Sequence, residues 1–286
     1  MRRIAVVVDG SADLPESLRA GEEIHVVPQI LVVDGERLVE GKDITSEEIY
    51  EAVLAGVPVN IGHPPPDDFR VVYKKMRAHI EGIVTLTLST TFNPTLISAQ
   101  VAGITYPKLP TEVINSQQVS MGLGFVALAA ARHAREGGNL EQVTHAAREA
   151  IPHVHTAFLP QDIRYPYRAG YLSRLAYLTH RALGHVPLLV MEKGHLVVRE
   201  FGRGGDQGME RLVSWGRSRV GEAPVWAAIV HARAADLAER LAQQVHRTLH
   251  VRDVVVTTLT PIVGLRTGPG TVGLVLYEDA STSLIP

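Results

Sequence analysis

Short runs of apolar, mostly β-branched residues alternate along the chain with longer segments in which apolar residues recur every three or four positions. The short runs predict strands at 4–8, 82–88, 111–115, 153–158, 187–191, 225–230 and 253–259. The longer segments predict helices at about 46–55, 67–79, 94–104, 120–136, 139–150, 171–183, 207–219 and 233–246. Such alternation favours parallel sheets with helices packed on their faces.

Two hairpins are predicted within this alternation. In HVVPQILVVDGERLVEG, two apolar runs are joined by Asp34 and Gly35, which is a strong hairpin signal. Lys193 and Gly194 take the same place in VMEKGHLVVREF. Both segments are therefore expected to form antiparallel strand pairs.

The length of the chain exceeds the usual size of a single hydrophobic core. Its 286 residues favour two lobes, and the proline-rich tract LPQDIRYPY at 159–167 is the best candidate for the boundary between them. We therefore predict an α/β N-terminal lobe over 1–160, with a mostly parallel sheet and flanking helices, and an α/β C-terminal lobe over 161–286.

Composition and charge argue against several classes of function. The chain has no cysteine, which excludes disulfides, thiolate catalysis and cysteine-ligated metals and fits an intracellular protein. The formal net charge of -2, without a run rich in lysine and arginine, argues against nucleic acid as a partner. No eighteen apolar residues run together, and the first apolar run ends at Asp9, so neither a transmembrane span nor a signal peptide is expected. The expected location is the cytoplasm.

Short polar side chains follow the predicted strand at 82–88, where ligands bind in open parallel sheets. Ser89, Thr90 and Asn93 stand just before Pro94, which is placed to begin a helix. Asn93 is expected to cap that helix. A helix N-terminus with spare hydroxyl groups beside it is a suitable site for a carboxylate or a phosphate.

The helix predicted at 120–136 carries two glycines in its first turn. Gly122 and Gly124 each cost roughly 1 kcal/mol relative to alanine inside a helix. Their presence predicts that another group lies very close to the backbone of this turn. Either the helix packs tightly on the sheet, or an apolar ligand chain lies against it.

The sequence RTGPG, Arg266 to Gly270, combines glycines with a permanent positive charge. Glycine lets the backbone approach a ligand and present its N–H groups, and the arginine side chain does not titrate. This combination suits an anion.

Four segments in order along the chain, VVVDGSADLP, STTFNPTLISAQ, VINSQQVSMGLG and VGLRTGPGTVG, resemble the motifs of the DegV family of bacterial fatty-acid-binding proteins. The resemblance covers nearly the whole chain, as one domain over 3–282. It implies a two-lobed α/β protein that holds a long-chain fatty acid such as palmitate in an apolar tunnel between the lobes. The family resemblance also implies a binder with no cofactor, no metal and no stable membrane insertion, rather than an enzyme. It implies a role in lipid transport or fatty acid metabolism, with the carboxylate presented to a separate fatty acid kinase.

The resemblance also indicates which residues would hold the ligand. The positions that it assigns to the carboxylate are Ser89, Thr90, Asn93, Arg266, Asn60 and Ile61, and those that it assigns to the tunnel lining or a turn are Gly122, Gly124 and Gly268.

The chain departs from the family pattern at three places. In NIGHPPP, Ile61 and Gly62 replace a hydroxyl pair, so Asn60 is the nearest polar substitute. Arg266 replaces the usual histidine, which exchanges a titratable donor for a permanently charged, bidentate one. The family's glycine–glycine–arginine segment is altered to RAGYLSR, where Arg168 and Arg174 are candidate replacements, and this puts the kinase partnership in question.

An enzyme is the main alternative. A phosphotransferase or hydrolase acting on a small phosphorylated substrate at the same crevice would use Asp9, Asp13, Ser89 and Thr90 to hold Mg²⁺ and phosphate. The chain contains no P-loop, no nucleophile elbow and no kinase signature. Capping of a turn accounts for the aspartates on structural grounds.

Metal binding is a further alternative, prompted by 13 histidines. His153 and His155 would point to one face of a strand. No third ligand stands at a diagnostic spacing, so surface or capping histidines are favoured.

Overall fold

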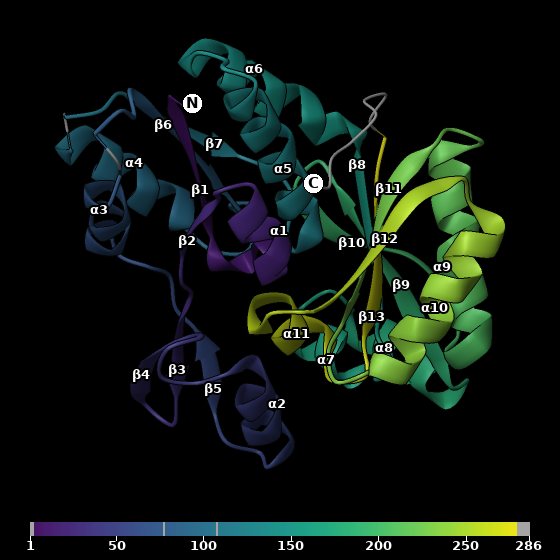
Figure 1. Ribbon diagram of the computed structural model, residues 1–286. Coiled ribbons are helices and arrows are strands. Elements are labelled where there is room, and N and C mark those ends of the chain that lie inside the picture. The colour runs from purple at the N-terminus through teal and green to yellow at the C-terminus, as the bar shows by residue number, and fades with distance from the viewer. Residues whose placement is uncertain (1–2, 77, 107, 279–286) are drawn as a thin grey trace. The chain divides into compact units, whose positions relative to one another are not determined.

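The computed structural model describes residues 3–76, 78–106 and 108–278 (Figure 1). The chain forms two compact units, which are described separately: unit 1 covers Met1–His153, and unit 2 begins at Val154. This division precedes the predicted boundary at 160/161 because the strand β8, Val154–Leu159, pairs within the sheet of unit 2. The predicted end of the second lobe at 286 lies outside the described residues.

The main sheet of unit 1 is parallel throughout, with strand order β2-β1-β6-β7. Its strands are β1 (Ile4–Asp9), β2 (His25–Val27), β6 (Gly82–Thr87) and β7 (Thr111–Asn115). The mostly parallel sheet predicted for the N-terminal lobe is therefore confirmed.

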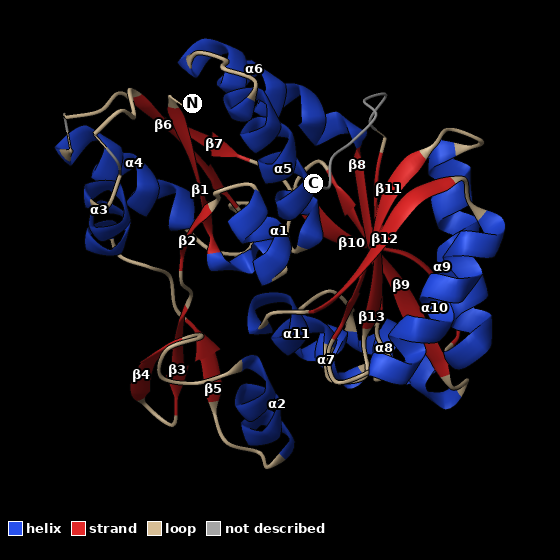
Figure 2. Ribbon diagram, viewed as in Figure 1, coloured by secondary structure: helices blue, strands red, loops and turns tan. Residues whose placement is uncertain are grey.

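Helices cover both faces of this sheet (Figure 2). The helical elements beside it are η1 (Gly10–Ala12), α1 (Glu16–Gly21), α3 (Pro66–Lys74), α4 (Thr95–Thr105), α5 (Met121–Arg135), α6 (Leu140–Ala150) and η2 (Ile151–His153). Ala5 and Val7 of β1 pack with Phe69 and Tyr73 of α3 and with Ala99 of α4 on one face. The buried helix α5 packs against β1 and β6 on the other face. The apolar periodicity of the sequence is what makes these helix faces fit the sheet.

A small antiparallel sheet, with order β4-β3-β5, completes unit 1. Its elements are β3 (Ile30–Val33), β4 (Glu36–Val39), β5 (Val59–Ile61) and the helix α2 (Ser46–Leu54). Asp34 and Gly35 both have positive φ, 49° and 84°, as a tight two-residue hairpin turn requires. This hairpin is as predicted.

Unit 2 is built on a six-stranded sheet with order β10-β9-β8-β13-β11-β12. Besides β8, its strands are β9 (His185–Glu192), β10 (His195–Arg203), β11 (Val225–His231), β12 (Val251–Thr258) and β13 (Val272–Tyr277). Every neighbouring pair is antiparallel except β11 and β12. The antiparallel pair β9 and β10 is the hairpin predicted at Lys193 and Gly194. The general preference for parallel strands does not hold in this unit, where the unpredicted strand β13 also runs antiparallel to both of its neighbours.

The helices of unit 2 are α7 (Arg164–Arg168), α8 (Arg174–Ala182), α9 (Gly205–Val220), α10 (Ala235–Thr248) and α11 (Pro261–Thr267). The core of the unit forms where α9 and α10 cover one face of the sheet (Figure 1). Leu212 of α9 and Leu241 of α10 are fully buried there with Leu188, Ile229 and Leu274 of the strands. Of the helices that the structure describes, none has both the length and the apolar character needed to cross a membrane.

Candidate functional site

Asp9 lies at the carboxyl end of β1 and joins three segments of unit 1. Its Oδ1 accepts hydrogen bonds from the backbone N–H and hydroxyl of Ser11 and from Nε2 of Gln29, at 3.0 Å for the N–H and 2.9 Å for Nε2. Its Oδ2 accepts the backbone N–H of Leu88, at 2.7 Å. Burial raises the pKa of Asp9, and these hydrogen bonds oppose that rise. Both carboxylate oxygens of Asp9 thus accept hydrogen bonds that join the ends of β1 and β6 and the loop of Gln29. A carboxylate that is engaged in this way is poorly placed to bind a metal ion.

The loop after β6 presents hydroxyl groups at the same edge of the sheet. Ser89 is 1% exposed, and its backbone N–H donates to the carbonyl oxygen of Gln118, at 2.8 Å. The hydroxyl oxygens of Ser89 and Thr91 lie 3.2 Å apart. Thr90 is exposed, and its Oγ1 accepts from Nδ2 of Asn115, at 3.4 Å. The loop thus carries one buried and two exposed hydroxyl groups, and their role in binding an anion stays a prediction.

Asn93 connects this loop to α4 and to the small sheet. Its Oδ1 accepts the backbone N–H of Thr95, the first residue of α4, at 3.1 Å. The N-cap position itself is taken by Pro94, so the prediction that Asn93 is the cap and that Pro94 begins the helix is off by one residue. Its Nδ2 lies 3.5 Å from the carbonyl oxygen of Gly62, directly after β5. On β5 itself Asn60 is exposed and Ile61 half-buried. Among the described residues, the side chain of Asn60 forms no hydrogen bond, so its link to the hydroxyl loop stays a prediction.

Ser120, immediately before α5, forms a contact that sequence analysis missed. It is fully buried, with φ 58° and ψ −148°, a strained conformation for a residue other than glycine. Its hydroxyl donates to Oδ2 of Asp13. In the next turn, a Cβ at Gly124 would lie 2.9 Å from the carbonyl oxygen of Ala12, and Gly122 is buried. These contacts favour tight packing as the reason for the glycine at 124.

Arg266 lies in unit 2, in the last turn of α11. Its guanidinium donates from one terminal nitrogen to the carbonyl oxygen of Ile262, at 2.9 Å. Burial lowers the pKa of Arg266, and the nearby Tyr171 opposes that shift. A half-buried guanidinium keeps its charge, because an arginine side chain does not deprotonate in proteins.

The glycines after Arg266 do not present free N–H groups, which corrects the sequence-based expectation. The N–H of Gly268 donates to the carbonyl oxygen of Gly264, and that of Gly270 donates to Ala232, both at 2.7 Å. Gly268 has a φ of 91°, and a Cβ there would collide with the ring of Tyr165. The glycines therefore make the turn and its close packing possible.

The structure gives little support to a metal site. The residues that it describes contain no group of three histidine, aspartate or glutamate side chains able to hold a metal ion. His155 bonds through Nε2 to Oε1 of Glu278, at 2.6 Å, and His153 lies in η2 rather than on the strand.

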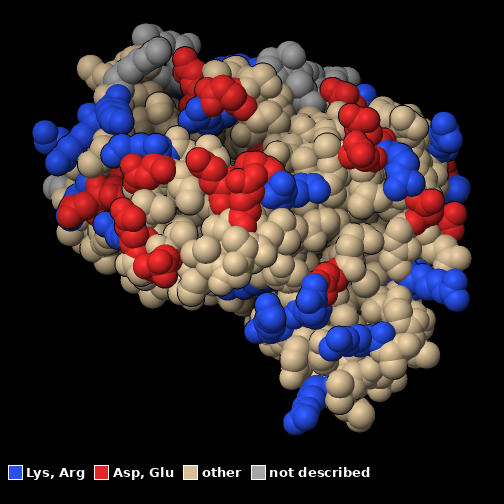
Figure 3. Space-filling model, turned by 90° about the horizontal axis from the view of Figure 1, so that it is seen from below, with Lys and Arg blue, Asp and Glu red and all other residues tan. Residues whose placement is uncertain are grey.

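Acidic and basic side chains both occur, among large uncharged areas, on the face shown in Figure 3.

Glu40, beside the N-terminus of α2, supplies a pH-dependent contribution to stability. Burial raises its pKa to about 7, although the hydroxyl of Ser46 donates to its Oε1, at 2.6 Å. Because the folded-state pKa lies above the ordinary value, this contribution is complete below pH 4.5 and is lost as the pH rises through about 7. We expect Glu40→Gln to gain about 2 kcal/mol in free energy of unfolding over the unsubstituted protein between about pH 5 and pH 8. Urea titrations followed by circular dichroism would test this, and a pH-independent difference between the two proteins would contradict it.

Comparison with known proteins relates this arrangement to a family. The family model for DegV, described as a family of uncharacterised proteins, matches residues 3–279. A DegV domain-containing protein of Streptomyces coelicolor is 31% identical over 277 residues, which cover 96% of this chain and 98% of that protein. Among solved structures, a fatty-acid-binding DegV family protein from Thermus thermophilus is 26% identical with a TM-score of 0.87, and the match covers 98% of this chain and all of that one. A hypothetical protein from Thermotoga maritima, reported to reveal fatty acid binding function, is 21% identical with a TM-score of 0.85, over 98% and 100% of the two chains.

Proposed function

This chain belongs to the DegV family, and from that premise we propose that it binds a long-chain fatty acid, such as palmitate, without changing it chemically. The observation that carries the proposal is the likeness, over essentially the whole length of both chains, to the fatty-acid-binding protein of Thermus thermophilus. The edge of the parallel sheet in unit 1 supports it, because buried and exposed hydroxyl groups gather there beside the start of a helix.

The residues that we propose as ligands of the carboxylate are those that the family resemblance assigns to it. In unit 1, Ser89 and Thr90 supply hydroxyl groups and Asn93 a side-chain amide. Asn60 and Ile61, on β5, directly precede Gly62, whose carbonyl oxygen is the group that the side chain of Asn93 approaches. In unit 2, Arg266 supplies the charge that complements the carboxylate. The walls of the proposed tunnel and its turns include Gly122, Gly124 and Gly268.

Burial of the acyl tail is expected to supply most of the affinity. Each buried CH₂ contributes about 0.8 kcal/mol, so affinity should rise roughly fourfold for each added methylene until the cavity is full. Calorimetric titration of delipidated protein with saturated acids from decanoate to stearate would measure this rise and show the chain length at which it stops. Mass spectrometry of an organic extract of the purified protein should identify the lipid that it carries. Failure of the delipidated, folded protein to bind any of these acids would refute the proposal.

We propose the further role of a carrier that presents the carboxylate to a separate fatty acid kinase. Arg168, the last residue of α7, and Arg174, the first residue of α8, are exposed at the two ends of the altered segment and are available to a partner. Acyl phosphate, trapped by hydroxylamine as the hydroxamate, should form from bound palmitate and ATP only when such a kinase is added. Formation without the kinase would instead favour the phosphotransferase alternative.

A further inference from the structure

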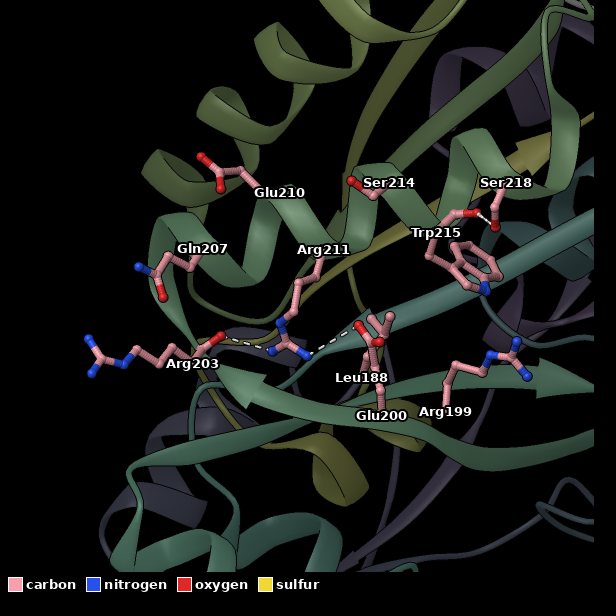
Figure 4. Close-up of a pocket in the computed structure, with 10 residues that line it drawn as sticks. All are labelled: Leu188, Arg199, Glu200, Arg203, Gln207, Glu210, Arg211, Ser214, Trp215 and Ser218. Carbon is pink, nitrogen blue, oxygen red and sulfur yellow. Dashed lines mark hydrogen bonds and ion pairs between the residues drawn. The ribbon is translucent and has the colours of Figure 1, made fainter.

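A groove of about 710 Å³ lies in unit 2 between α9 and the edge strand β10 (Figure 4). This volume falls within the range of about 300 to 1,000 Å³ that is usual for sites of small molecules. All of its lining residues belong to unit 2, and they include none of the residues proposed to bind the fatty acid. The groove is therefore a separate feature of the unit.

The side of α9 that faces the groove is polar. Gln207, Arg211, Ser214 and Ser218 follow one another at intervals of three or four residues, which places them along one helix face. The core-facing residues of the same helix, such as Leu212, are apolar and buried. Gln207, Ser214 and Ser218 are exposed, so this stripe is the solvent-facing side of an amphipathic helix, and it lines the groove with polar groups.

Arg211 forms the floor of the groove and is held flat against β10. One terminal nitrogen donates to the carbonyl oxygen of Arg203, at 2.8 Å, and the other lies 3.5 Å from Oε1 of Glu200. A Cβ at position 202 would lie 2.8 Å from Cζ of Arg211, so Gly202 makes room for the guanidinium. Its Nε has no acceptor among the described residues. The guanidinium is thus fixed in place, with its Nε buried and its two terminal nitrogens each bonded to an acceptor on β10.

Two more arginines stand at the ends of the groove. Arg199 and Arg203 are exposed, and within the part of the chain that the structure describes their side chains form no hydrogen bond or ion pair. Figure 4 shows their guanidinium groups extending to opposite ends of the groove, while Glu210 points away from β10. Trp215, only 8% exposed, contributes an indole N–H that also lacks an acceptor among the described residues. The lining therefore carries three arginines against two glutamates, an excess of one positive charge.

We propose that this groove binds a small molecule that carries two or more negatively charged oxygen groups, either phosphates or carboxylates. An arginine fork matches both groups in geometry and charge. The fixed guanidinium of Arg211 would bind the middle of such a molecule, and Arg199 and Arg203 would bind its charged ends. Arg203 stands four positions after Arg199 on the strand, roughly 13 Å of backbone, so the site favours an extended polyanion over a single phosphate ion.

Titration of the full-length protein with inorganic tripolyphosphate and, separately, with citrate would test the proposal and distinguish the two chemistries. The chain has two tryptophans, so its ¹H–¹⁵N spectrum contains two indole signals. We expect at least one of the probes to move the Trp215 signal saturably at a concentration below about 1 mM, with the Trp226 signal unchanged. Added salt should weaken the binding.

Substitutions at the ends of the groove provide the matched control. Arg199→Gln and Arg203→Gln are each expected to weaken binding at least fivefold, and both side chains are exposed, so the fold should be unaffected. Arg217→Gln changes an exposed arginine of α9 that pairs with Glu222 outside the groove, and it should leave the affinity as it was. No saturable shift with either probe, or equal affinity in the Arg199→Gln/Arg203→Gln double variant, would overturn the proposal. Fatty acid binding by the same variants should remain normal.

Discussion

Replacing Asp9 with alanine is expected to lower the free energy of unfolding of unit 1 by about 3 kcal/mol. The substitution leaves four buried donors from three residues without their acceptor. They are the backbone N–H of Leu88, the side-chain amide of Gln29, and the backbone N–H and hydroxyl of Ser11. Each unsatisfied buried group costs about 1 to 3 kcal/mol. Burial of the Asp9 side chain also carries a desolvation cost, which is the cause of its raised pKa. Alanine removes that cost, so the total loss of stability is smaller than the costs of the unsatisfied donors added together.

Hydrogen exchange measured by mass spectrometry is the suitable method for this variant. Trp215 and Trp226, the two tryptophans of the chain, both lie in unit 2, so intrinsic fluorescence reports on the wrong unit. Amides of β1 and β6 should exchange roughly 100-fold faster in Asp9→Ala, while those of unit 2 stay unchanged. Asp67, which pairs with Arg70 and is 75% exposed, is the matched control, and Asp67→Ala should change exchange by less than about fivefold. Unchanged exchange in β1 and β6 would show that Asp9 does not hold this edge together.

Local patterns predicted the elements of the fold well, but not the direction in which all strands run. The turns at Asp34 and Gly35 and at Lys193 and Gly194 each join two strands as predicted, because a hairpin signal depends on a few adjacent residues. The six buried residues of β13 carry no periodicity that separates a strand from other buried segments. Whether that strand runs parallel or antiparallel to β8 depends on a chain reversal near Gly270 and on pairing with distant residues. Such pairing has no local signature.

In the candidate site, too, local sequence patterns predict the loops but not the contacts between residues that are distant along the chain. The hydroxyl loop was predictable, because the residues from Ser89 to Asn93 follow a strand and precede a helix. The bond from Ser120 to Asp13 was not, since 107 positions separate the two residues along the chain. A glycine-rich turn can expose its backbone, and for that reason the RTGPG motif predicts free N–H groups near Gly268. Their acceptors come from an unpredicted helix turn and from the loop after β11, and neither is visible in the RTGPG motif itself.

Replacing Arg266 with alanine is expected to weaken the binding of palmitate by about 10- to 100-fold. Hydrogen bonds between charged groups contribute about 1.5 to 3 kcal/mol, and each 1.4 kcal/mol corresponds to a factor of ten in affinity. Palmityl alcohol, with the same tail and a neutral head, should lose less than about twofold, because tail burial does not depend on the guanidinium. Calorimetry with both ligands separates the two roles. Equal losses for acid and alcohol would show that Arg266 acts through the fold, and no loss for either would exclude it from the head-group site.

The variant Arg266→His adds a test that depends on charge alone. The guanidinium stays ionised even though burial lowers its pKa, so palmitate affinity of the unsubstituted protein should be flat between about pH 6 and pH 8. An imidazole titrates near pH 6.5, so the affinity of the histidine variant should fall as the pH rises through that region and the ring loses its charge. Arg217→His, on the exposed side of α9, should leave the profile flat. A flat profile for Arg266→His would mean that the carboxylate does not sense the charge at position 266, and its recognition would then depend on the hydroxyl loop of unit 1 alone.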